Sequence, residues 1–306
     1  MMSAASRPTR GEPIQGGRMK RRSTAFLATA TVALTMVLGA VAVPAQAATG
    51  FTYVALGDSY AAGTGTTTGV ATPLGGGSPC FQSATSYPNQ LAAYAQLTTG
   101  FINVTCAGAT TSDIGTELSA AVQAGATSGV SQVTVTVGGN DLGFAQTLQA
   151  CAKPASPECQ TALATATSKL KTVSAKVSGV ITQIRGAAPG ARIYVTGYPL
   201  LFGNFKTPTC DVGGYGVPKT TATTINGITS ALNLSIAGAV VRAEWKGDWK
   251  VRYVPVAGAF YGHGLCDSKT PWINRYVASP YEFQSFHPNA FGETAYATTL
   301  KLAGAK

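Results

Sequence analysis

The sequence predicts an α/β fold, a three-layer α/β/α sandwich built on a central five-stranded parallel sheet. Short apolar runs rich in β-branched and aromatic residues alternate with longer segments in which apolar residues recur at helical spacing. Such alternation favours a parallel sheet that is covered by helices on both faces. The 306 residues are 45% hydrophobic and only 11% charged, which is enough apolar material for a core of that size.

Five apolar runs are the predicted strands: Phe51–Leu56, Phe101–Thr105, Val133–Val137, Ile193–Thr196 and Val251–Val256. Five segments with helical periodicity are the predicted helices: Ser86–Leu97, Thr111–Ala124, Cys159–Ala187, Thr221–Trp245 and Ala290–Leu302. In the second of these helices we expect a Ser112 cap. Its apolar positions share one face: Ile114, Leu118, Ala121 and Val122. The Gly-, Thr- and Pro-rich stretch Gly63–Pro79 is predicted to be a loop.

Residues 1–47 precede this pattern and are typical of an N-terminal extension followed by a secretory signal peptide. The basic residues 20–22 lead into the apolar run Thr24–Val43, and "AQA" ending at Ala47 is a small-residue cleavage site. The apolar run nearly reaches the length of a transmembrane helix, but the well-formed cleavage site favours a signal peptide over a stable membrane span. We therefore predict a secreted, extracellular protein with one domain, residues 48–306.

The charge of that domain does not suggest a nucleic-acid partner. Removing residues 1–47 leaves 16 basic and 11 acidic residues, a net charge of +5 instead of the +10 of the full chain. The basic residues are scattered singly and form no cluster beside aromatic residues. A mild attraction to an anionic surface remains, and we expect a monomer.

Six cysteines behind an export signal predict disulfides. Fifteen pairings are possible by counting. We prefer the sequential pairs Cys80–Cys106, Cys151–Cys159 and Cys210–Cys266, because each would clip one loop-rich stretch. A metal site is not expected, since the chain has no CxxC and no histidine near the cysteines at ligand spacing.

Ligands of open parallel sheets bind outside the carboxyl ends of the strands. The residues at those positions are "GDSYAAG", "CAGATTSD" and "GGNDLGF", after the first, second and third predicted strands. Ser59 in the first stretch would present its hydroxyl at a strand-to-helix turn, where helical N–H groups favour negative charge. The alternative is an ordinary turn serine, because a serine needs a base to become a nucleophile.

The domain offers two histidines as that base. His287 in "SFHPN" precedes the last predicted helix, and Pro288 restricts the backbone there. His263 lies in a glycine-flanked loop beside a cysteine, so we prefer His287. Gly108 and Asn140, each just after a strand, could join the Ser59 amide as donors to an oxyanion.

In this order, "GDSY", "GAT", "GGND" and "FHPN" resemble the SGNH (GDSL-type) serine hydrolase family over essentially the whole predicted domain. The family's Ser, Gly, Asn and His match Ser59, Gly108, Asn140 and His287. The resemblance implies a flavodoxin-like fold, a Ser59–His287 acyl-enzyme mechanism without metal or organic cofactor, and an oxyanion hole formed by Ser59, Gly108 and Asn140. The cysteine layout is most similar to secreted bacterial lipases and phospholipases, in which sequential disulfides are usual.

The chain departs from the family at one position. Many members have Asp three residues before the catalytic histidine, and this chain has Gln284. Some members orient the imidazole through a backbone carbonyl, so we expect the main-chain oxygen of Gln284 or Ser285 to do so. Glu282 is the alternative. Asp58 and Asp141 adjoin key residues, and we interpret both as loop braces.

The substrate is the least determined property. The apolar stretch Tyr198–Phe205 follows the fourth strand and would form an acyl-chain wall, if it is not ordinary core. Fatty-acyl esters of lipids, at a lipid–water interface and with phospholipase A-type cleavage included, are the first hypothesis. A carbohydrate acetyl esterase with a Trp-lined cleft is the alternative; its candidate residues are Trp245, Trp249 and Trp272. A non-catalytic binding protein is a remote third, because the chain keeps every catalytic residue type.

Overall fold

The computed structural model of the chain describes residues 52–67, 80–97, 100–126, 129–152 and 156–306. The predicted signal peptide, residues 1–47, lies outside the described residues, as does most of the predicted loop Gly63–Pro79. The central sheet has five strands: β1 (Tyr53–Gly57), β2 (Phe101–Asn103), β3 (Gln132–Thr136), β4 (Arg192–Thr196) and β7 (Val251–Val254).

The sheet is entirely parallel, with the strand order β2-β1-β3-β4-β7. The predicted five-stranded parallel sheet is confirmed, and the order is that of a flavodoxin-like fold. Every residue of β1 and of β3 is buried. Although β3 alternates polar and apolar residues, the hydroxyls of Thr134 and Thr136 have hydrogen-bond partners inside the protein, which makes their burial tolerable. The order reverses between β1 and β3, so loops leaving these neighbouring strands diverge and leave a crevice at their carboxyl ends.

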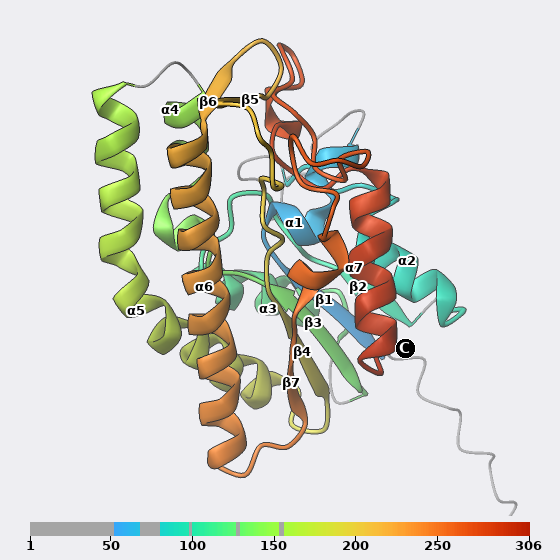
Figure 1. Cartoon of the computed structure of the whole chain (residues 1–306). Coiled ribbons are helices and arrows are strands. Elements are labelled where there is room, and N and C mark those ends of the chain that lie inside the picture. The colour runs from blue at the N-terminus through green and yellow to red at the C-terminus, as the bar shows by residue number, and fades with distance from the viewer. Residues whose placement is uncertain (1–51, 68–79, 98–99, 127–128, 153–155) are drawn as a thin grey trace, which may run out of the picture. The chain divides into compact units, whose positions relative to one another are not determined.

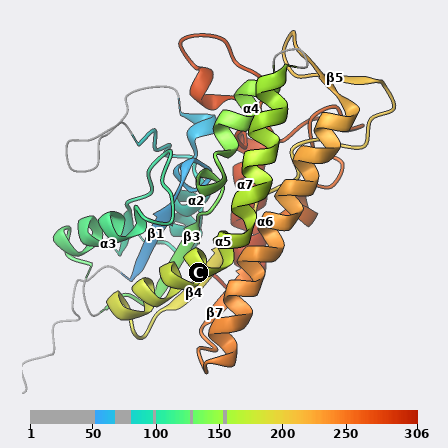
Figure 2. The same ribbon diagram turned by 90° about the vertical axis from the view of Figure 1, so that its left-hand side faces the viewer.

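Helices cover both faces of the sheet, as Figures 1 and 2 show. On one face α2 (Tyr87–Tyr94) packs against α7 (Ala290–Leu302), with the rings of Tyr87 and Tyr296 stacked 5.3 Å apart. The other face carries α3 (Ile114–Gln123), α5 (Pro157–Ala187) and α6 (Lys219–Trp245), and α5 and α6 run side by side.

The helix α6 is the one described helix that is long and apolar enough to span a membrane by length and composition. One face of the helix lies against the protein interior, with Ile225, Leu232 and Ile236 each at most 1% exposed, whereas Leu234 and Trp245 on the helix are 75% and 83% exposed. Packing in the core therefore accounts for the apolar residues on one face of α6.

Two details of the predicted helices are wrong. The residue at the N-terminal cap position of α3 is Asp113 and not Ser112. The Asp113 carboxylate makes no capping bond to the helix and accepts instead from the amide and hydroxyl of Thr110, in the preceding turn. Val122 is 49% exposed, and the buried position on that face is taken by Glu117, which is 2% exposed. The Glu117 carboxylate accepts a 2.7 Å hydrogen bond from the Gly57 amide, and this partner compensates part of the cost of burying it.

Two elements were not predicted from the sequence. The helix α4 (Phe144–Ala152) directly follows the 3₁₀ turn Asn140–Leu142, and a hairpin of β5 (Thr209–Asp211) and β6 (Gly216–Pro218) precedes α6. Both lie at the same end of the sheet as the short helix α1 (Ser59–Ala62) in Figure 1.

The structure contains three disulfides: Cys80–Cys106, Cys151–Cys159 and Cys210–Cys266. They coincide with the sequential pairing preferred from the sequence. The first joins the loop before α2 to the loop after β2, the second joins α4 to α5, and the third joins the hairpin to the segment after β7. All three therefore hold segments at or near the carboxyl end of the sheet.

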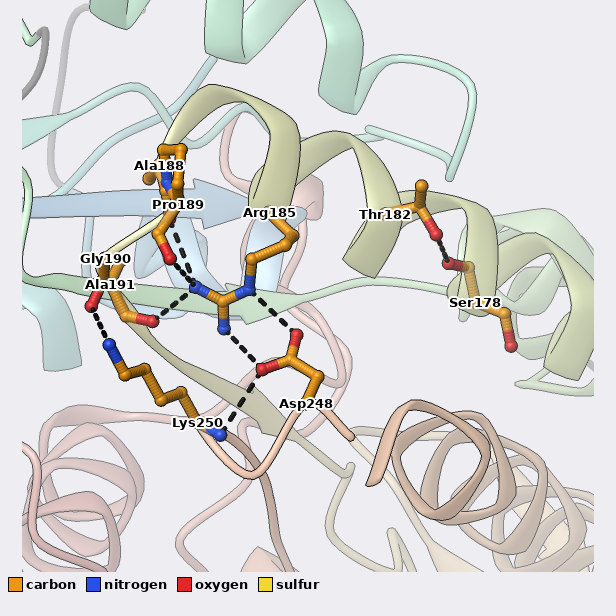
Figure 3. Close-up of polar contacts among 9 residues, drawn as sticks. All are labelled: Ser178, Thr182, Arg185, Ala188, Pro189, Gly190, Ala191, Asp248 and Lys250. Atoms are coloured by element: carbon orange, nitrogen blue, oxygen red, sulfur yellow. Dashed lines mark hydrogen bonds and ion pairs between the residues drawn. The ribbon is translucent and has the colours of Figure 1, made fainter. Parts of the chain in front are cut away.

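The opposite end of the sheet is held by an ion pair, shown in Figure 3. Both nitrogens Nε and Nη2 of Arg185, in the last turn of α5, donate to the carboxylate of Asp248 at 2.8 and 2.9 Å. Its Nη1 donates to three carbonyls of the following turn: those of Ala188, Pro189 and Ala191. The guanidinium thus joins the end of α5 to the turn between α6 and β7.

Candidate active site

Ser59 begins the single-turn helix α1, immediately after the carboxyl end of β1. Asp58 is the N-terminal cap of this turn and accepts a hydrogen bond from the Tyr60 amide. Before it, Gly57 has φ +124° and lies so close to β3 that a Cβ would be 2.2 Å from the Thr136 carbonyl oxygen. Only glycine fits there, and the close approach holds the serine turn firmly against the sheet.

His287 lies beside this serine although the two are far apart in the chain. Its Nε2 is 2.7 Å from the Ser59 Oγ, within hydrogen-bond distance. With Nε2 as the acceptor, the imidazole can take the hydroxyl proton, which is the geometry required of a general base. The structure therefore brings together the serine and the histidine that were selected from the sequence.

The backbone around His287 is held from several sides. The Asn274 amide donates to the His287 carbonyl at 2.9 Å, and the Phe286 amide donates to the Asn274 carbonyl at 3.1 Å. The side chain of Asn274 donates to the carbonyl of Gly65, the residue in the turn after α1, at 2.8 Å. A Cβ on Gly65 would be 2.1 Å from the Pro288 carbonyl oxygen, so the histidine loop and the serine segment are in close contact.

The second ring nitrogen of His287, Nδ1, is buried and has no partner of normal hydrogen-bond geometry among the described residues. Burial lowers the pKa of His287 to about 4, and the backbone carbonyls of Ser285, Phe283 and Gln284 oppose this shift. A lowered pKa keeps the imidazole neutral near pH 7, as a base must be.

The two remaining candidates, Gly108 and Asn140, line the same cavity as Ser59 and His287. Gly108 has φ +85°, and a Cβ there would meet no atom within 4 Å, so its backbone faces open space. Asn140 begins the 3₁₀ turn after β3, and its Nδ2 donates to the Ala109 carbonyl at 3.0 Å. That bond places the amide of Asn140 beside the loop that carries Gly108.

Asp58 and Asp141 make the contacts of loop braces. Asp58 Oδ2 accepts from the Tyr198 hydroxyl at 2.5 Å, and that hydroxyl accepts from the Gly139 amide at 3.0 Å. Burial raises the pKa of Asp58 to about 7. The carboxylate of Asp141 accepts from the amide and hydroxyl of Thr111 at 2.9 and 2.7 Å. Asp58 thus links the serine turn to the Asn140 turn, and Asp141 links the latter to the Gly108 loop.

The four candidate residues open into a cavity of about 880 Å³, large enough for a long apolar ligand. Most of its walls are apolar or aromatic. They include Phe81, Phe144, Leu148, Tyr198, Tyr215, Tyr276, Phe283 and Phe286. The charged residues among the described lining are all acidic: the buried Asp58, and Glu158 and Glu282, which are exposed.

The predicted acyl-chain wall is largely wrong. Of the stretch Tyr198–Phe205 only Tyr198 lines this cavity, while Leu201 and Phe202 are core residues at most 4% exposed. The apolar wall comes instead from α4, through Phe144 and Leu148. The i, i+4 spacing of these two residues directly after "GGND" was a usable helical signal that the sequence analysis missed.

None of the three tryptophans lines the cavity. Trp245 and Trp249 are 83% and 77% exposed at the far end of α6 and in the turn after it. Trp272 stacks on the ring of His263 at 3.7 Å, and His263 Nδ1 lies 2.8 Å from the Thr270 carbonyl oxygen. His263 is absent from the described cavity lining, and its contacts are those of a packed structural residue.

Comparison with known proteins agrees with this geometry. The GDSL-like Lipase/Acylhydrolase family model matches residues 55–295. A lipase of Streptomyces rimosus is 33% identical over 294 residues, covering 94% of this chain and 99% of that protein.

Two crystal structures are similar over 82% of this chain and 98% of their own. An extracellular lipase from Streptomyces rimosus has a TM-score of 0.65 and 33% identity, and phospholipase A1 from Streptomyces albidoflavus NA297 has a TM-score of 0.66 and 32% identity. The resemblance and the fold expected from the sequence are thereby confirmed.

Proposed function

Because this chain belongs to the GDSL-like lipase/acylhydrolase family, we propose that it is a secreted serine esterase that cleaves fatty-acyl esters of lipids. The prediction of a carboxylic ester hydrolase is confirmed by that family. The observation that carries the proposed mechanism is the 2.7 Å contact between Ser59 Oγ and His287 Nε2 at the floor of an apolar cavity.

The proposed reaction has two halves. Ser59 Oγ attacks the ester carbonyl carbon while His287 Nε2 takes the hydroxyl proton, and the negative charge develops on the carbonyl oxygen. The amides of Ser59 and Gly108 and the side chain of Asn140 donate to that oxygen. His287 then gives its proton to the departing alcohol, which leaves an acyl-Ser59 ester. Water, deprotonated by His287, hydrolyses this ester and returns Ser59 with release of the carboxylic acid.

His287 needs an acceptor for its Nδ1 proton to hold the productive tautomer. The backbone carbonyls of Gln284 and Ser285, together with that of Phe283, are the groups that oppose the lowering of its pKa. We assign the orientation of the His287 ring to the carbonyls of this turn. The hydrogen bond from Nδ1 to one of them reaches its final geometry when the substrate is bound.

The shape and composition of the cavity support a lipid substrate. An aromatic and aliphatic lining binds an acyl chain through burial of apolar surface, at about 25 cal/mol per Å². The similar phospholipase A1 makes acyl esters of phospholipids reasonable substrates. No tryptophan lines the described cavity, so the feature that motivated the carbohydrate acetyl esterase hypothesis does not lie at the site.

Secretion is supported by two independent features. Three disulfides are typical of proteins that fold in an oxidising compartment. A similar crystal structure is that of an extracellular lipase. A single chain supplies every group of the proposed mechanism, so a monomer acting at a lipid–water interface suffices.

The test is a series of nitrophenyl esters from acetyl to palmitoyl, run beside a phospholipid and acetylated xylan. We expect the longer acyl esters and the phospholipid to be hydrolysed, and a preference for acetyl esters alone would contradict the lipid assignment. Ser59→Ala should abolish hydrolysis, and Asn140→Ala should reduce kcat by about 10²–10³-fold. Ser119→Ala, on the exposed side of α3, is the matched control and should keep full activity.

A further inference from the structure

We propose that the β5–β6 hairpin is the specificity wall of the cavity, and that Tyr215 with Tyr276 sets the preference for long acyl chains. This inference rests on the proposed function and deepens it. Both tyrosines line the cavity, and their rings meet edge to face with centroids 5.1 Å apart. Both are only partly buried although they pack against the core, so apolar ring surface remains available to a ligand.

The hairpin is short, yet its position is strongly constrained. Cys210 in β5 is bonded to Cys266, in the segment after β7. At the tip, the Asp211 carboxylate accepts hydrogen bonds from the amides of Gly213 and Gly214, both at 2.8 Å. A two-stranded hairpin of this length has no hydrophobic core of its own. The disulfide and the Asp211 hydrogen bonds therefore fix its conformation.

The tip is also bonded directly to the segment that carries Tyr276. The Tyr276 amide donates to the Val212 carbonyl at 2.6 Å, and the Val212 amide donates to the Tyr215 carbonyl at 2.9 Å. Gly213 has φ +109°, and a Cβ there would be 2.7 Å from the Tyr276 carbonyl oxygen. The two tyrosines are therefore positioned by one hydrogen-bonded unit.

The helix α4 supplies a second wall of the cavity, beside the hairpin. Phe144, Leu148 and Ala152 of α4 line the same cavity as Ser59, and α4 contacts β6 of the hairpin. The nine residues of α4 correspond to about 13 Å of helix. The proposal is that an acyl chain whose carbonyl carbon lies at Ser59 follows α4 and meets the tyrosine pair only when the chain is long. Acetyl and butyryl groups would remain beside the serine.

Tyr215→Ala tests this directly, through the dependence of kcat/KM on acyl length. For acetyl and butyryl esters we expect values within about twofold of wild type, since the chain does not extend to the hairpin. For the palmitoyl ester we expect a fall of about tenfold, the size of a lost apolar contact in a substrate pocket. Tyr215→Phe, which keeps the ring, should retain the wild-type profile.

Tyr261→Ala is the matched control, because Tyr261 is 88% exposed and is not among the residues that line this cavity. Equal losses at every chain length, or no loss at palmitoyl, would overturn the proposal. If the alanine variant does not fold, Tyr215→Leu keeps apolar volume and should give a smaller loss confined to long chains. Failure of the proposed function is distinguishable, since wild type would then lack long-chain activity altogether.

Discussion

The hydroxyl of Tyr60 donates a 2.9 Å hydrogen bond to the carbonyl of Phe286, so the residue after Ser59 is bonded to the residue before His287. Phe286 has φ +62°, a conformation that costs a non-glycine residue about 1–3 kcal/mol and needs support from its surroundings. The ring of Tyr60 also contacts that of His287, with centroids 5.3 Å apart. This bond therefore connects the two halves of the proposed dyad independently of the dyad itself.

Tyr60→Phe should weaken both stability and turnover. The ring remains, but the buried Phe286 carbonyl loses its donor, which costs about 1–2 kcal/mol in the free energy of unfolding. We expect kcat to fall about tenfold, with KM for a short ester unchanged, because a misplaced base slows chemistry more than binding. Denaturant unfolding and steady-state kinetics measure the two effects. Tyr261→Phe is the control, and an unchanged kcat in Tyr60→Phe would show that the bond does not position His287.

Glu282→Gln should be mild, with kcat reduced less than about threefold. Glu282 lines the cavity, but no contact joins it to His287, and the carbonyls that oppose the lowered pKa of His287 belong to residues 283–285. A loss of the order seen when a triad acid is removed, about 10⁴-fold, would instead make Glu282 the orienting group. Steady-state kinetics on one nitrophenyl ester distinguishes these outcomes.

The pH dependence follows from the buried position of His287. Protonated His287 cannot accept the Ser59 proton, so kcat/KM should fall as the pH drops through the pKa of the folded protein. Since burial lowers that pKa from 6.5 toward about 4, we expect the acid midpoint to lie below 6.5. His287 has a higher pKa in the unfolded chain, so the unfolded chain binds a proton there more readily than the folded protein does. Protonation of His287 therefore lowers the free energy of unfolding as the pH falls from 6.5 toward 4.

A pH–rate profile of the free enzyme measures this midpoint. Asp58, whose pKa burial raises to about 7, is the group most easily confused with His287. In Asp58→Asn, kcat/KM should still fall at low pH with the same midpoint. If that fall disappears in the variant, the titrating group is Asp58 and not His287. A wild-type midpoint at or above 6.5 would contradict the account of His287.

Arg185→Lys should lower the free energy of unfolding without changing catalysis. Lysine keeps the charge but loses the paired contact with Asp248 and most of the bonds to the turn carbonyls. Both side chains are 23% exposed, so solvent screening limits the expected loss to about 1–2 kcal/mol. The ion pair lies at the end of the sheet opposite Ser59, so kcat/KM should stay within about twofold. A double-mutant cycle with Asp248→Asn isolates the pair, and zero coupling would refute the assigned role.

The sequence predicted best those features that depend on residues close together in the chain, namely the strands and the residues that directly follow them. Strands of a buried parallel sheet favour β-branched and aromatic residues, and all five were predicted within a few residues of their observed bounds. The strand-end rule then placed Ser59, Gly108 and Asn140 at one edge, where they line one cavity. His287 was selected from two histidines by its place before a helix, and its contact with Ser59 agrees with that choice.

The parts that were missed depend on contacts between distant segments. Val122 and Glu117 share a helix, and the burial of Glu117 is made tolerable by backbone groups of distant residues, above all the Gly57 amide. The apolar stretch Tyr198–Phe205 was predicted to form an acyl-chain wall, but Leu201 and Phe202 point into the protein core and are buried there. The hairpin that carries Tyr215 is held by a disulfide and backbone bonds to Tyr276, which leave no periodic signal in the sequence.

The most direct test is to locate the acyl group during turnover. Rapid acid quenching of the enzyme with a long-chain nitrophenyl ester, followed by peptide mass spectrometry, should find the acyl mass on the peptide containing Ser59. His287→Ala should fail to form that adduct at a comparable rate. An acyl group on any other residue, or turnover at the wild-type rate by Ser59→Ala, would contradict the central claim.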